Sequence, residues 1–210
     1  MDGVITNTMP DHYKAWNMIF AQEGFHLSHL EVYSREGQPG LISVKELFAE
    51  KKISFSKEKA MQILKKKEVL FKKIVRRRFI PGARRFLRFL HRNNFTLALV
   101  TGTSRHELHR ILPGALYKLF DVVITGSDVK NGKPHPEPFL KALQKLKCQP
   151  REAVVIENAP FGIQSAKEAG LKCFALETSL PKPYLKKADF IFKTVKEMQD
   201  KIEFIAWDRQ

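Results

Sequence analysis

Several polar residues follow the ends of predicted strands, where they could form one site. They are Asp2, Thr101 with Thr103, Lys133, and Glu157 with Asn158. Their side chains offer carboxylates, hydroxyls, an amide and an ammonium group, which can exchange protons, donate hydrogen bonds and neutralise an anion. Single members also have structural explanations, since Thr101 to Thr103 could form a turn and Glu157 could cap the next helix. Their joint order along the chain is far more specific than any one of them.

The elements that must position these residues are predicted from hydrophobic patterning. From Phe95 onward, short apolar runs alternate with amphipathic stretches. The pattern predicts buried strands at 96–100, 121–125, 153–156, 172–176 and 189–192, with helices at 105–112, 137–146 and 162–169. Alternating strands and helices indicate an α/β core with a parallel sheet, in which ligands bind beyond the carboxyl ends of the strands.

The segment 10–79 contains no convincing strand and has the pattern of an all-helical insert. Helical periodicity covers 11–23, 44–50 and 56–78, and Ser56 with Glu58 suits a helix start. The run Ile80-Pro81-Gly82 breaks the pattern before a further helix at 83–91. We expect residues 1–9 to begin the core domain, 10–80 to form a cap and 81–210 to complete the core. The tail at 193–210 is predicted to form a terminal helix.

The chain is strongly basic, with a net charge of +15. Most of the excess lies in residues 57–92, which contain fourteen Lys or Arg and two Glu. A solvated helix face is the simpler explanation of this run. Nucleic acid is not the expected partner, because no binding motif or aromatic interleaving accompanies the basic residues. A basic surface can still attract phosphorylated metabolites.

The sequence lacks an apolar run long enough to span a bilayer, and residues 1–20 do not resemble a signal peptide. Cys148 and Cys173 have no metal-ligand spacing and are expected to be buried thiols, which suits a reducing compartment. We therefore expect a cytoplasmic protein without a membrane partner. A monomer or weak dimer is the expected state.

The order of the polar groups resembles the haloacid dehalogenase-like superfamily of phosphotransferases over nearly the whole chain. The first motif of that family, Asp-x-Asp-Gly followed by Val or Thr, matches "MDGV" except for the first aspartate. The second motif matches "LALVTGTS" at Thr101, and the third matches "NGKPHPEPF" at Lys133. The fourth, an acidic pair after a strand, matches "VVIENAPFGIQSAKEAG" at Glu157, with Asn158 in place of the second acid.

The resemblance implies a Rossmann-like core with an inserted helical cap, and phosphoryl transfer through an aspartyl-phosphate. It places the nucleophilic aspartate immediately before Met1 and makes Asp2 the general acid and then the base. It also implies that Thr101, with Thr103 beside it, contacts phosphoryl oxygens. Lys133 would neutralise the phosphoryl group and the nucleophile.

A magnesium site is also implied by the resemblance, with Asp2, Glu157 and Asn158 as its protein ligands. An amide oxygen can ligate magnesium but brings no charge. We therefore expect weaker metal affinity than an aspartate at this position would give.

The position of Asp2 leaves two interpretations open. Either Met1 is internal to a longer protein and is the variable residue of the first motif, or the chain lacks the nucleophile and the first strand and is a pseudoenzyme. In this family that strand lies at the centre of the sheet, so its loss would leave two neighbours without partners. Folding physics therefore favours the longer protein.

The helical insert resembles the small cap of the β-phosphoglucomutase and sugar-phosphate phosphatase subgroup. The segments that match are "DHYKAW", with His12 and Trp16, and "SREG", with Arg35. By resemblance His12 controls access of the general acid and Arg35 holds a second phosphate. His12 and Trp16 could also simply pack together, being one helical turn apart. Lys67 lies on the apolar face of the helix predicted at 56–78, where it either snorkels to water or points at substrate.

These observations predict a magnesium-dependent phosphatase that acts on a small phosphorylated metabolite, with a sugar phosphate favoured. A mutase of the β-phosphoglucomutase type is the first alternative, because the motif residues do not distinguish transfer to water from transfer to a sugar hydroxyl. The second alternative is a non-catalytic protein that binds a phosphorylated ligand or nucleic acid.

Overall fold

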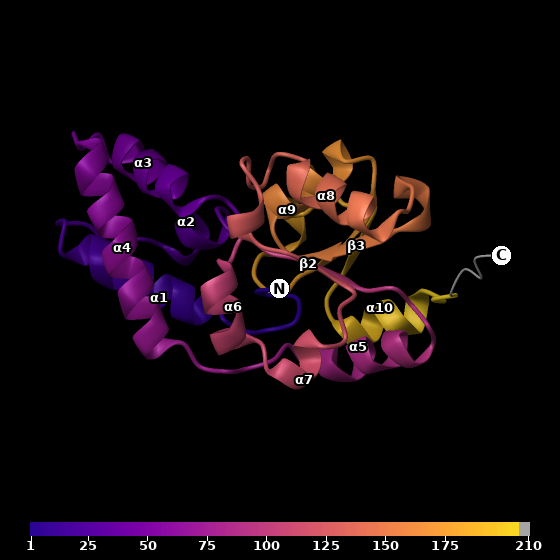
Figure 1. Ribbon diagram of the computed structural model, residues 1–210. Helices are drawn as coiled ribbons and strands as arrows, with labels where there is room; N and C mark the ends of the chain where they lie inside the picture. The colour runs from indigo at the N-terminus through magenta and orange to yellow at the C-terminus, as the bar shows by residue number, and fades with distance from the viewer. Residues whose placement is uncertain (206–210) are drawn as a thin grey trace.

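All the strands of the core pair in parallel in the computed structural model, which describes residues 1–205 (Figure 1). Strand β1 (Ala98–Val100) pairs with β2 (Val122–Ile124). A second sheet has the order β3 (Val154–Glu157), β4 (Lys172–Leu176) and β5 (Phe190–Phe192). The predicted α/β core with a parallel sheet is confirmed.

Helices cover both faces of these strands. They are α5 (Ala83–Arg92), α6 (Arg105–Ile111), α7 (Gly114–Tyr117), α8 (Glu137–Leu146), α9 (Pro160–Glu168) and α10 (Val195–Lys201). Figure 1 shows α8 and α9 on one side of the strands, and α5 and α10 on the other. Single turns of 3₁₀ helix at Gly126–Asp128, Pro150–Glu152 and Lys182–Tyr184 complete the connections.

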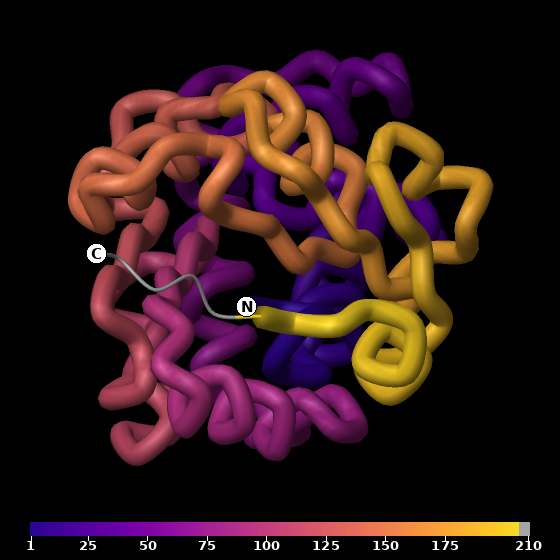
Figure 2. Tube along the Cα trace, turned by 90° about the vertical axis from the view of Figure 1, so that its right-hand side faces the viewer, coloured from indigo at the N-terminus to yellow at the C-terminus, as the bar shows by residue number. Residues whose placement is uncertain are grey.

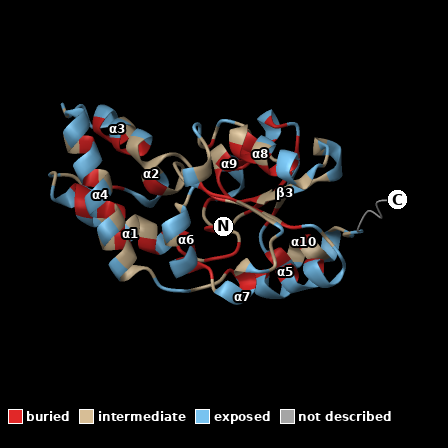
Figure 3. Ribbon diagram, viewed as in Figure 1, coloured by how far each residue is buried: buried red, intermediate tan, exposed pale blue. Residues whose placement is uncertain are grey.

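The cap is an all-helical lobe beside the core, formed by α1 (Met9–Ala21), α2 (His29–Tyr33), α3 (Gly40–Glu50) and α4 (Lys57–Ile74). It has a hydrophobic core of its own, rich in aromatic rings, in which Phe20 and Phe48 are fully buried. Figure 3 shows buried residues on the faces that these helices turn toward one another. This separate core supports the division of the chain at about residues 10 and 80, which we keep as a proposal.

Most predicted elements are present, with their ends moved by a few residues. The strand at 172–176 and the helix at 137–146 match the prediction fully. Helix α1 begins at Met9, two residues early, because Pro10 fits the first turn of a helix, where its missing N–H is not needed. Two short helices, α2 and α7, were not predicted.

The predicted end of the long cap helix at residue 78 is wrong, since α4 ends at Ile74. Asp11 accepts a hydrogen bond from the Arg76 amide at 3.1 Å and forms an ion pair with Arg78 at 2.8 Å. These contacts hold the backbone after Ile74 against α1. The predicted terminal helix, for which the sequence sets no end, is α10; it ends at Lys201, and 202–205 are not helical. The rest of that prediction, 206–210, lies outside the described residues.

A cavity of about 510 Å³ separates the two sheets. Its walls include the backbone and side chains of β1 and β3, with Phe86, Leu90 and Leu176. Residue 1 lies at the middle of the core, beside this cavity (Figure 2). Among residues 1–205, β1 pairs only with β2, and β3 only with β4, so each presents an open edge. None of the helices in this part of the chain has the length and apolar character needed to cross a membrane.

Candidate active site

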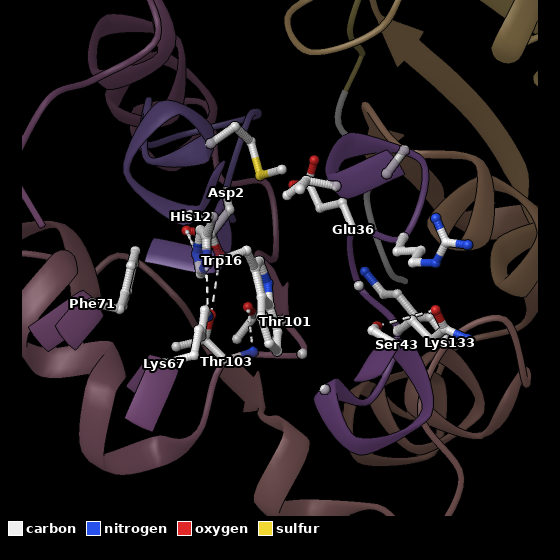
Figure 4. Close-up of a pocket in the computed structure, with 18 of the residues that line it drawn as sticks. Asp2, His12, Trp16, Glu36, Ser43, Lys67, Phe71, Thr101, Thr103 and Lys133 are labelled. Atoms are coloured by element: carbon white, nitrogen blue, oxygen red, sulfur yellow. Dashed lines mark hydrogen bonds and ion pairs between the residues drawn. The ribbon is translucent and has the colours of Figure 1, made fainter. Parts of the chain in front are cut away.

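A second cavity, of about 170 Å³, lies between the cap and the carboxyl ends of the strands (Figure 4). Its core wall contains Asp2, Thr101, Lys133 and Glu157. The cap contributes residues from α1, α3 and α4 and from the loop after α2; they include His12, Arg35, Glu36 and Lys67. The polar residues that the sequence predicts to form one site therefore line one cavity, except for Asn158.

Asp2 is held as a carboxylate by hydroxyl groups. Its Oδ2 accepts a hydrogen bond from the Thr103 hydroxyl at 3.0 Å, and its Oδ1 accepts one from Thr8. His12 Nε2 lies 3.9 Å from Oδ1. Burial alone would raise the pKa of Asp2, but His12 and Thr8 lower it below its usual value. The structure thus favours the ionised form of Asp2, which can accept a proton.

Thr101 and Thr103 form a tight turn as well as a wall of the cavity. The Thr103 amide donates to Thr101 Oγ1 at 3.1 Å, so the structural explanation of this segment is correct. Thr101 is buried at the end of β1 and lines the cavity. The Thr103 hydroxyl is engaged with Asp2, and its predicted contact with phosphate stays a prediction.

Lys133 and Glu157 form a buried ion pair of 2.5 Å at the floor of the cavity. Burial would raise the pKa of Glu157, but Lys133 lowers it below its usual value. Glu157 also accepts hydrogen bonds from the amides of Asn158 and Ala159, at 2.9 and 3.3 Å. Both amides precede α9, which begins at Pro160 and has no side-chain cap bond, so the prediction that Glu157 could cap this helix is wrong.

Asn158 lies just behind the cavity, where its amide contacts both domains. Its Nδ2 donates to Glu36 Oε2 of the cap and to Ser179 Oγ of the core, each at 2.8 Å. Gly3 makes room for this side chain, since a Cβ there would lie 1.9 Å from Nδ2. Asn158 therefore packs against Gly3, the residue that follows Asp2.

The predicted metal ligands have suitable chemistry. Asp2, Glu157 and Asn158 are all buried and all supply oxygen atoms, which magnesium prefers. Within residues 1–205, no three His, Cys, Asp or Glu side chains gather closely enough to hold a metal ion. The predicted set of Asp2, Glu157 and Asn158 contains only two such side chains, because its third member is an amide. The donor set thus fits a hard cation, and its use as a metal site stays a prediction.

His12 and Lys67 form the polar part of the cap wall. Lys67 Nζ lies 3.0 Å from His12 Nδ1, 4.7 Å from the Phe71 ring centre and 5.0 Å from that of Trp16 (Figure 4). Burial lowers the pKa of Lys67 to about 8, and burial followed by the charge of Lys67 lowers that of His12. Lys67 is only 8% exposed, so the snorkelling alternative is wrong. Trp16 packs on Phe20 in the cap core, and His12 stacks on Phe71 rather than on Trp16.

Arg35 lines the cavity, but its guanidinium is engaged by acids of the cap. It forms ion pairs with Glu46, at 3.4 Å, and with Glu50, and it donates to the Glu31 carbonyl at 2.7 Å. These contacts fix Arg35 at the edge of the cavity. Its predicted role as a phosphate clamp stays a prediction.

Sequence reasoning missed three residues that support the site: Thr8, Ser179 and Glu107. Thr8 and Ser179 contact Asp2 and Asn158, and Glu107 lines the cavity from α6. No sequence pattern marks Thr8 or Ser179, because they act through folding contacts. Glu107 has a signal, since it follows Ser104 by three residues in the pattern of a helix start.

Comparison with known proteins identifies the family. The model of the haloacid dehalogenase-like hydrolase family matches residues 1–176. The chain belongs to the haloacid dehalogenase-like hydrolases. This confirms the superfamily inferred from the four motifs, and with it a phosphatase- or mutase-type enzyme whose α/β core carries a helical cap.

Similar proteins include two phosphatases and a solved β-phosphoglucomutase. The chain is 34% identical over 179 residues to a phosphorylated carbohydrates phosphatase of Thermotoga maritima, covering 82% of this chain and 80% of that protein. It is 30% identical over 203 residues to a validoxylamine A 7'-phosphate phosphatase of Streptomyces hygroscopicus subsp. limoneus. This match covers 95% of this chain and 93% of that protein. A solved structure of a β-phosphoglucomutase from Clostridium difficile superposes with a TM-score of 0.77 at 26% identity. The match covers 95% of this chain and 93% of that one.

Proposed function

We propose that this protein is a magnesium-dependent phosphatase that cleaves a small phosphorylated metabolite, preferably a sugar phosphate, through an aspartyl-phosphate. The observation that carries this function is the cavity of about 170 Å³ in which Asp2, Thr101 and Lys133 face a cap wall containing His12 and Lys67. A cavity of this size suits a small molecule better than a polymer. The activities of the two similar phosphatases support the same substrate class.

Each core residue then has a chemical task. Thr101 and Lys133 bind phosphoryl oxygens, and Lys133 offsets their charge. Asp2 protonates the leaving oxygen and later takes a proton from the water that attacks the aspartyl-phosphate. The hydrogen bonds from Thr8 and Thr103 favour the second, ionised state. Before Asp2 can protonate the leaving oxygen it must itself bind a proton, which requires that Thr8, Thr103 or His12 move away from it.

The cation would be held by Asp2, Glu157 and Asn158. Magnesium supplies positive charge opposite the phosphoryl oxygens when it is bound. Glu157 meanwhile keeps Lys133 in place through their ion pair of 2.5 Å. Asn158 contributes an uncharged oxygen, so we expect a weakly bound metal.

The nucleophile in this proposal is an aspartate immediately before Met1, at the end of a strand between β1 and β3. The cavity of about 510 Å³ with open strand edges on both sides supports that position. A strand there would pair with both edges and fill the apolar space between them. We place the enzyme in the cytoplasm as a monomer or weak dimer, in keeping with the thiol of Cys173, which is buried in the core.

A mutase of the β-phosphoglucomutase type is the second candidate. The position of His12 beside Asp2, and the likeness to a solved β-phosphoglucomutase, favour it. A mutase returns the phosphoryl group to a sugar hydroxyl and must exclude water. It would isomerise a hexose 1-phosphate once a catalytic amount of a sugar bisphosphate is added. Release of inorganic phosphate without isomerisation would exclude it.

The test is the intact mass of the protein from its native source, together with phosphate release from a panel of sugar phosphates. We expect a mass above the 24.3 kDa of this chain and turnover that is lost when EDTA removes the metal. A mass of 24.3 kDa with ligand binding but no turnover would contradict the proposal. It would favour a non-catalytic binding protein.

A further inference from the structure

The loop 34–39 of the cap lies directly against the core. A Cβ at Gly102 would lie 3.2 Å from the Gly37 carbonyl oxygen, and one at Gly132 would lie 2.9 Å from Pro39 Cγ. Gly37 itself has a φ of +83°, which a side chain would oppose. Glycine thus allows the cap and core backbones to touch, and this contact brings the neighbouring Glu36 into the core.

Glu36 reaches the one position at which the fourth motif departs from its family. The motif has Asn158 where a second acid is expected, and the carboxylate beside it comes from the cap, 122 residues away in sequence. The contact is a hydrogen bond of 2.8 Å from Asn158 Nδ2 to Glu36 Oε2. The cap therefore places an acid next to the side chain that replaces one.

The chemistry of this pair fixes the orientation of the Asn158 amide. Glu36 Oε2 accepts its hydrogen bond from Asn158 Nδ2, so the NH₂ group of the amide faces Glu36. The same NH₂ group donates to Ser179, which uses its second proton. Oδ1 is then directed away from Glu36 and Ser179. Outer partners of this kind orient metal ligands and tune their affinity.

We propose that Glu36 is a positioning residue that turns Asn158 Oδ1 toward the cation only when the cap is closed. Cation binding and cap closure then stabilise each other, because the same amide serves both. The inference rests on the magnesium-dependent function proposed above. It adds that a cap residue completes the metal site of the core.

The first experiment measures binding of Mn²⁺, used in place of Mg²⁺, by electron paramagnetic resonance without substrate. We expect Glu36→Ala to weaken Mn²⁺ binding about tenfold. Glu36→Gln, which keeps an acceptor, should restore part of it. Ser179→Ala is the comparison variant, because it removes the bond that the core makes to the same nitrogen and should weaken Mn²⁺ binding without opening the cap. Equal Mn²⁺ affinity of Glu36→Ala and the native protein would overturn the inference.

The second experiment exchanges acid and amide across the contact. Asn158→Asp removes the NH₂ group that donates to Glu36, so small-angle scattering without metal should show an opened cap. Adding Glu36→Gln gives the new carboxylate at position 158 a donor again, and the double variant should close. A double variant as open as Asn158→Asp alone would contradict the inference. This second experiment remains informative if Glu36→Ala does not fold.

The two proposals can fail separately. If the native protein binds Mn²⁺ and releases phosphate while the variants at position 36 behave like it, only the cap coupling is wrong. If the native protein neither binds Mn²⁺ nor releases phosphate, the proposed function fails and the coupling with it.

Discussion

The two walls of the cavity between cap and core are built from different chemistry. On the core wall, Asp2 and Glu157 are tied by hydroxyls, backbone amides and the Lys133 ammonium group. On the cap wall, Lys67 lies among the rings of Trp16 and Phe71. The core thus holds its groups rigidly at fixed positions, as a reaction requires. The cap presents the Lys67 cation among aromatic rings, which suits substrate selection.

The sharpest test of the core wall is Asp2→Asn. We expect kcat to fall by about 10²–10⁴-fold, because the amide can neither protonate the leaving group nor activate water. The amide has nearly the same shape as the carboxylate, so circular dichroism should show an unchanged fold. Phosphate release within threefold of the native rate would show that Asp2 is not the acid and base.

Lys133→Met tests whether the core wall depends on its ion pair. The variant leaves the Glu157 carboxylate buried without its cation, and we expect a loss of about 3–5 kcal/mol in the free energy of unfolding. Urea denaturation measures it. The control is Lys133→Met with Glu157→Gln, which removes both charges and should recover a large part of the loss. Equal stability of the single and double variants would mean that the pair is not what holds this wall.

Lys67→Met tests the cap wall and gives a dependence on pH. Lys67 has a pKa of about 8 in the folded protein against 10.5 when unfolded, so its charge opposes folding below pH 8. Relative to the variant, the native protein should gain about 3 kcal/mol between pH 8 and 10.5. If Lys67 binds substrate phosphate, native kcat/KM should fall above pH 8 while that of the variant stays low and flat. A native profile that is flat through pH 8 would exclude this role.

Arg35→Ala carries the smallest expected effect. Because Glu46 and Glu50 engage the guanidinium, we expect KM for a monophosphate to change less than about threefold. If Arg35 is also the predicted phosphate clamp, KM for a bisphosphate should rise about tenfold or more. Comparing the two substrates separates the roles. Equal changes would favour a purely structural Arg35.

The core half of the site could be predicted from the sequence because parallel strands bring their carboxyl ends together. Asp2, Thr101, Lys133 and Glu157 are far apart in the chain, yet strand ends alone predict that they converge. The cap half was harder. The pattern placed Lys67 on an apolar face, but whether it turns to water or to the cavity depends on how α1 and α4 pack.

Other features depend on tertiary contacts that no local pattern records. The end of α4 is set by Asp11, which captures the Arg76 amide from another helix. The contact of Glu36 with Asn158 joins residues on different domains, and neither residue type predicts it. The short helix α2 did leave a signal, because Ser28 and Glu31 form a capping box.

The open edges of β1 and β3 have a consequence for association. Backbone N–H and C=O groups that lack a partner along a strand edge can pair with a strand of another chain. The proposed strand between β1 and β3 would use both edges, whereas residues 1–205 alone leave them open. The 210 residues prepared alone should therefore aggregate more readily than a protein that includes this strand.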